Sequence, residues 1–105
     1  MSETIIVRRT GQAPLRVRGE VIASSGSSWV TGRRQTVRII RTSTGKFVVA
    51  IQYETQWQGE HNTDEAAVLP SLKQIVEYLS GRVPGWMLQE LIEELGEEAI
   101  AEEIE

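Results

Sequence analysis

The sequence lacks cysteine altogether, and its 105 residues include one histidine, three prolines and only 6% aromatic side chains. Without cysteine there is no disulfide, no thiolate metal site and no cysteine nucleophile. The single histidine, His61, rules out sites that need several imidazoles and disfavours catalytic-triad chemistry. We therefore expect no metal, no cofactor and no enzymatic activity.

Long apolar runs are also absent. The longest, Phe47–Ile51, has five residues, far fewer than the roughly 18 that a membrane-spanning helix requires. The N-terminal residues contain no apolar stretch as long as that of a secretory signal, so we expect a cytoplasmic protein without membrane contact. With 40% hydrophobic and 25% charged residues, the composition predicts one globular domain over residues 1–105.

Residues 1–69 carry the patterns of β-strands. Leu15–Val21 alternates apolar with charged side chains at a period of two, as a strand with one buried face does. Thr36–Thr42 and Lys46–Trp57 are rich in β-branched and aromatic residues, and the glycine between them is typical of a hairpin turn. The serine- and glycine-rich segment 24–35 predicts a mobile loop.

Residues 71–104 carry helical patterns. Ser71 and Gln74 have the spacing of a capping box at the start of a first helix. Pro84 suits the first turn of a second helix, and Gly96 marks its end. Strands followed by helices favour an α+β fold, with an antiparallel sheet of about four to five strands and two to three C-terminal helices packed on one face.

Charge is distributed unevenly along the chain. Residues 1–46 contain nine basic and two acidic residues, whereas residues 47–105 contain two basic and thirteen acidic residues. This asymmetry is typical of an anion-binding face combined with an acidic tail. It is equally typical of a basic sheet that lies against acidic helices within one domain.

The arginines form the first set of candidate functional residues. Eight of the nine basic residues in the first 46 are arginine, whose planar guanidinium group suits phosphate and carboxylate recognition. Strand alternation places several of them on an outward sheet face near a tryptophan, where they could contact phosphates and stack a base. This arrangement predicts nucleic-acid binding. The candidate binding residues are Arg16, Arg18, Trp29, Arg33, Arg34 and Arg38.

An apolar set supports a second function. Strict alternation places Ile40, Val48 and Ala50 opposite the main core, where they would form an exposed patch bordered by arginines, as in a protein interface. A covering loop or helix, or a bulge that shifts the register, would instead bury them. We favour a small non-enzymatic interaction or regulatory domain that binds a protein partner or forms a homodimer, with nucleic-acid binding as the alternative.

Three segments, Arg41–Val48, Leu69–Leu72 and Leu95–Ile104, resemble small bacterial proteins named for a C-terminal Glu-x-Leu-Asp-Ile motif. The segments span about the last two-thirds of the chain. The motif itself is not reproduced, since the sequence ends in Glu-Glu-Ile-Glu. The resemblance implies a bacterial origin and no particular activity.

Overall fold

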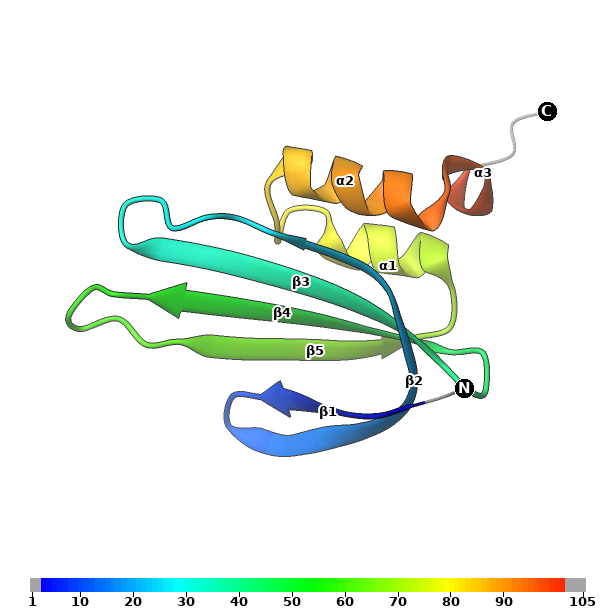
Figure 1. Cartoon of the computed structure of the whole chain (residues 1–105), viewed down its shortest axis with the longest axis horizontal. Helices are drawn as coiled ribbons and strands as arrows, with labels where there is room; N and C mark the ends of the chain where they lie inside the picture. The colour runs from blue at the N-terminus through cyan, green and yellow to red at the C-terminus, as the bar shows by residue number, and fades with distance from the viewer. Residues whose placement is uncertain (1–2, 102–105) are drawn as a thin grey trace.

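The structure is a computed structural model that describes residues 3–101, apart from the side chains of residues 98 and 99. Five strands form one antiparallel sheet in sequential order: β1 (Glu3–Arg9), β2 (Gln12–Gly26), β3 (Arg33–Thr42), β4 (Phe47–Thr55) and β5 (Thr63–Leu69). Three helices follow: α1 (Leu72–Leu79), α2 (Gly85–Leu95) and α3 (Glu97–Ile100). Figure 1 shows α1 and α2 on one face of the sheet. The predicted α+β fold is confirmed.

The sheet bends sharply along β2. The N-terminal half of this strand pairs with β1, and its C-terminal half pairs with β3. Between Val21 and Ala23 the register with β3 shifts, and a bulge of this kind bends the strand that contains it. At Gly19 a side chain would place its Cβ 2.1 Å from the carbonyl oxygen of Arg41, so only glycine allows this close approach. The β1–β2 hairpin therefore folds beneath β3–β5, on the side opposite the helices (Figure 1).

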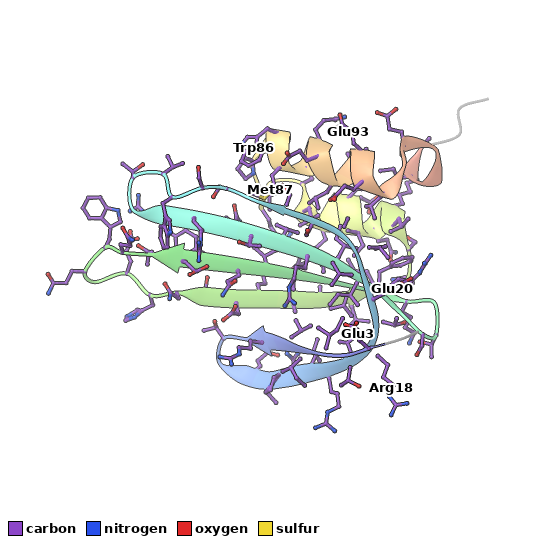
Figure 2. All side chains as sticks on the ribbon, in the orientation of Figure 1. Glu3, Arg18, Glu20, Trp86, Met87 and Glu93 are labelled. Atoms are coloured by element: carbon purple, nitrogen blue, oxygen red, sulfur yellow. The ribbon has the colours of Figure 1, made fainter. Side chains whose placement is uncertain are left out.

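The main core lies between the sheet and the helices. Alternate residues of β3 and β4 point toward α1 and α2, as the period of two predicts. Met87 of α2 is fully buried there (Figure 2). The other buried members are Ala23, Val37, Ile39, Val49, Ile51, Ile75, Leu79 and Leu91.

A second core lies on the other face of the sheet, and it overturns one prediction. Ile40, Val48 and Ala50 are 0%, 1% and 8% exposed, so the predicted open interface at these residues is wrong. The inner face of the β1–β2 hairpin covers them with Val7 and Val17. The cover is a β-hairpin rather than the loop or helix considered from the sequence, and the pairing of β3 with β4 has no register shift at these residues. The bulge lies in β2, where it allows the hairpin to turn under the sheet.

The curled sheet is joined at its two outer strands. The backbone N–H of Thr10, just after β1, donates to the carbonyl oxygen of Asp64 in β5 at 2.8 Å. The N–H of Asp64 donates in return to the Thr10 hydroxyl at 2.7 Å. This junction holds the first hairpin against the far edge of the sheet.

Half of the predicted mobile loop at 24–35 is strand, and residues 27–32 form the connection between the two strands. β2 continues to Gly26 and β3 begins at Arg33, because pairing between these two strands outweighs the local serine and glycine composition.

The helices begin close to the expected positions, and the Ser71 hydroxyl accepts the N–H of Gln74 at 3.3 Å. Pro84 is the N-cap of α2 rather than part of its first turn. The predicted end of the last helix lies outside the described residues. No helix within residues 3–101 is long and apolar enough to cross a membrane.

Candidate interaction surfaces

The connection between β2 and β3 ends in a tight turn centred on Thr31 and Gly32. The N–H of Val30 donates to the carbonyl oxygen of Arg33 at 2.8 Å, and the reverse bond is 3.0 Å. Both central residues have positive φ, 51° for Thr31 and 78° for Gly32, as in a type I′ turn. Glycine adopts this conformation freely, whereas a β-branched residue does so only with strain. The turn therefore holds strain at Thr31.

Trp57, in the connection between β4 and β5, holds this turn in place. Its indole N–H donates to the carbonyl oxygen of Thr31. The N–H of Gln56 donates to the carbonyl oxygen of Gly32 at 2.7 Å. A Cβ at Gly32 would lie 2.9 Å from the indole nitrogen, so the contact itself also requires glycine. Figure 1 shows the two connections side by side at one end of the sheet.

Large apolar side chains are exposed at this end. Trp29, Val30 and Trp57, which we call the tryptophan tip, are 40%, 61% and 52% exposed. The guanidinium of Arg34 lies 4.7 Å from the ring centre of Trp29, and that of Arg33 lies 5.7 Å from the ring centre of Trp57. These distances are within the range of cation–π attraction, which orients the two indoles.

The arginines at the tryptophan tip are already paired with carboxylates. Arg34 donates two hydrogen bonds to Glu54, its cross-strand neighbour, at 2.9 and 3.0 Å. Arg33 forms a similar pair with Glu60, which also accepts the Thr55 hydroxyl at 2.6 Å. The Arg33 guanidinium, followed by the Thr55 hydroxyl, lowers the pKa of Glu60 to about 2. The positive charge of the tip is thus neutralised within the chain.

The outer face of the first hairpin carries arginines without such partners. Arg16 and Arg18 on β2 are exposed, as is Arg8 on β1, and we call these three residues the arginine face. Figure 2 shows Arg18 pointing away from the sheet. Within residues 3–101, none of the three has an ion pair or a side-chain hydrogen bond. Adjacent like charges repel one another, so this face is a site where an anion would be stabilised.

The six arginine and tryptophan candidates from the sequence fall in three places rather than on one surface. Trp29, Arg33 and Arg34 lie together at the tryptophan tip, whereas Arg16 and Arg18 belong to the arginine face. The remaining candidate, Arg38, is half-buried on the hairpin side of β3 and lines a cavity of about 180 Å³. Sequence reasoning groups these residues together because it treats the sheet as flat.

The acidic residues of the helices lie on the opposite side of the molecule from the arginine face (Figure 2). The described ion pairs of the first 46 residues join Arg33, Arg34 and Arg41 to carboxylates of strands and loops, namely Glu60, Glu54 and Glu20. No described helix carboxylate pairs with an arginine of this part of the chain. The charge asymmetry of the sequence is therefore a separation of charge across the sheet.

A groove separates α2 from the C-terminal part of β2. Its volume is about 550 Å³, and it is lined by Ser24, Ser25, Gly26, Glu90, Glu93 and Glu94. Glu94 accepts the backbone N–H of Ser24 at 2.9 Å, and Glu90 accepts the hydroxyl of Ser25 at 2.6 Å. Sequence reasoning misses this site, because the helix spacing of the glutamates indicates only a solvated face.

The described residues contain no group of three or more histidine, cysteine, aspartate or glutamate side chains placed to hold a metal ion. Sequence reasoning also assigns Trp57 no functional role, although a tryptophan in a polar, glycine-containing segment is a signal of an exposed aromatic anchor.

No protein-family model matches the chain, and no curated protein or solved structure matches it significantly.

Proposed function

We propose that this chain is a small non-enzymatic interaction domain that binds a protein partner through the tryptophan tip. The observation that supports this proposal is the exposure of Trp29, Val30 and Trp57 on two connections that hydrogen bonds lock together. The proposal keeps the class of function expected from the sequence. It moves the interface away from Ile40, whose side chain is buried.

The chemistry of the tip suits a protein interface. Tryptophan and arginine are enriched among the residues that dominate binding energy at interface centres. A tryptophan buries up to roughly 200 Å², so covering an indole that is about half exposed removes about 100 Å² from water. At about 25 cal/mol per Å², each indole would contribute about 2.5 kcal/mol to binding. The turn also fixes the indoles in advance, which reduces the entropy lost on binding.

A protein partner suits the tip better than a nucleic acid does. Arg33 and Arg34 already donate to Glu60 and Glu54, so contact with phosphates would require these pairs to separate. The released carboxylates would then face the phosphates at close range, with like charges opposed.

Nucleic-acid binding remains the second candidate, and the arginine face favours it. Its three guanidinium groups have no carboxylate partner within residues 3–101. Binding of a single-stranded oligonucleotide there should weaken steeply with salt, because neutralised phosphates release counterions. Replacing Arg16 and Arg18 with glutamine should flatten the slope of log affinity against log salt by about one unit for each phosphate that is no longer neutralised. An unchanged slope would remove this candidate.

The tip can be tested with a matched pair of tryptophan variants. Trp57→Ala removes a tip side chain, and Trp86→Ala removes an equally exposed indole at the start of α2. Peptides selected from a displayed random library on the wild-type protein, and self-association measured by light scattering, serve as probes of binding. Trp57→Ala should weaken the binding of the selected peptides, or self-association, by about 70-fold, as removal of an anchor that contributes about 2.5 kcal/mol does. Equal effects from the two variants would contradict the proposal.

A further inference from the structure

The C-terminal part of β2 has a free edge. Among the described residues, β1 pairs along β2 no further than Gly19, whereas β3 pairs with β2 as far as Gly26. Backbone groups of alternate residues in an antiparallel strand point to opposite sides. Because the N–H of Ser27 donates to Gln35 of β3 at 2.9 Å, the backbone groups of Ser24 and Gly26 point away from β3.

This edge forms one wall of the acidic groove described above. The outward N–H of Ser24 donates to the Glu94 carboxylate. This carboxylate takes the place that a carbonyl oxygen of a neighbouring strand would occupy. Within residues 3–101, the N–H and C=O of Gly26 have no hydrogen-bond partner on that side. A row of open backbone groups is a template for strand addition.

The opposite wall of the groove carries uncompensated negative charge. The helical spacing along α2 places the like charges of Glu90, Glu93 and Glu94 next to one another, which is unfavourable. None of the three pairs with a cation within the described residues; the side chains that donate to Glu90 and Glu93 are the neutral Ser25 and Gln89.

We propose that this groove binds an extended peptide rich in arginine or lysine, which adds to β2 as a further strand. The peptide backbone would pair with Ser24 and Gly26, and its basic side chains on the α2 side would reach the carboxylates of Glu90, Glu93 and Glu94. Backbone pairing supplies affinity in this mode of recognition, and side-chain contacts supply specificity. The surface is different from the tryptophan tip, so this inference does not rest on the function proposed there.

Glu94 acts as a gate in this arrangement. It occupies the Ser24 N–H in the free protein, and a carbonyl oxygen of the incoming peptide takes its place. The released carboxylate then pairs with a basic side chain of the peptide. Glu94→Ala should therefore tighten the binding of a neutral β-forming peptide about twofold to tenfold, because one competing hydrogen bond is removed.

The experiment uses the full chain, labelled with ¹⁵N, and synthetic eight-residue peptides. One peptide alternates arginine with threonine or valine, a second has glutamate in place of arginine, a third has proline at two central positions of the basic sequence, and a fourth has serine in place of arginine. We expect the basic peptide to shift the amide signals of Ser24 and Gly26 and to slow hydrogen exchange at Gly26. Glu93→Gln should weaken its binding about twofold to fivefold, as removal of one exposed charge pair does.

Glu77→Gln on α1 is the matched control, since it removes the same charge from an exposed helix position outside the groove. The proposal is overturned if this control weakens binding as much as Glu93→Gln, which would indicate general attraction to the acidic side. It is also overturned if the proline-containing or the glutamate-containing peptide binds as tightly as the basic one. Signal changes confined to Trp57 and its neighbours would place the peptide at the tryptophan tip and overturn the proposal. If Glu94→Ala binds the serine-containing peptide no more tightly than the wild type does, Glu94 does not compete with the peptide for the Ser24 N–H.

Discussion

Thr31 offers a direct test of the strain in the β2–β3 turn. Its φ of 51° lies in the left-handed region, which costs ordinary residues roughly 1–2 kcal/mol, whereas asparagine is enriched there. Thr31 is exposed, and its side chain makes no hydrogen bond within the described residues, so a substitution there breaks no side-chain hydrogen bond. We expect Thr31→Asn to raise the free energy of unfolding by about 1 kcal/mol. For a domain of this size the melting temperature should rise by about 4–8 °C.

Urea and thermal unfolding, followed by circular dichroism, measure this change. Thr4→Asn is the control, because the same substitution at an extended position of β1 should be neutral or destabilising, since asparagine is depleted in strands. Gly32→Ala should have the opposite effect, since its φ is 78° and the new Cβ would crowd the indole nitrogen of Trp57. A Thr31→Asn protein with an unchanged or lowered unfolding midpoint would refute the argument that the turn is strained.

Two further predictions concern the second core and the tip. Ile40→Ala should lower the free energy of unfolding by about 2–5 kcal/mol in urea denaturation, because the side chain is fully buried; a variant as stable as the wild type would argue against that second core. The pKa of Glu60 is about 2 in the folded chain against its usual value of 4.5, so its stabilising effect is complete above about pH 4.5 and is lost as the pH falls toward 2. An NMR titration of the Glu60 carboxyl carbon checks this value, and Arg33→Gln should raise the pKa; a midpoint near 4.5 in the wild type would contradict the bidentate pair.

The periodic patterns of the sequence are sufficient to predict the order of strands and helices and the main core, but not the strand residues at both ends of segment 24–35. They do not predict the second core, because simple alternation implies only one buried face. The run Phe47–Ile51 contains no polar residue, and a strand that is apolar on both sides is typical of burial on both faces. That signal points to a cover over Ile40 and Val48, although it cannot identify the first hairpin as the cover.

The candidate surfaces are less predictable, because they depend on contacts between distant residues. Thr31 and Trp57 are 26 positions apart, and no local pattern connects them. The turn itself lacks the Asn-Gly or Asp-Gly signature of type I′ hairpins, so the serine and glycine content of the segment around it indicates a loop. The edge of β2 is likewise set by where β1 stops pairing, which is a property of the assembled sheet.

The junction between Thr10 and Asp64 has a consequence for how the chain folds. Each hydrogen-bonded strand pair of the sheet joins neighbours in sequence, so these pairs form across short connections at low entropic cost. The Thr10–Asp64 contact spans 54 residues, so its formation before the intervening strands pair would carry a larger entropic cost. We therefore expect the Thr10–Asp64 junction to be the last contact of the sheet to form during folding and the first to break. Its transient opening would expose Val7 and Val17 to solvent while the helix-side core stays intact, and the first hairpin would exchange its amide hydrogens as a separate unit.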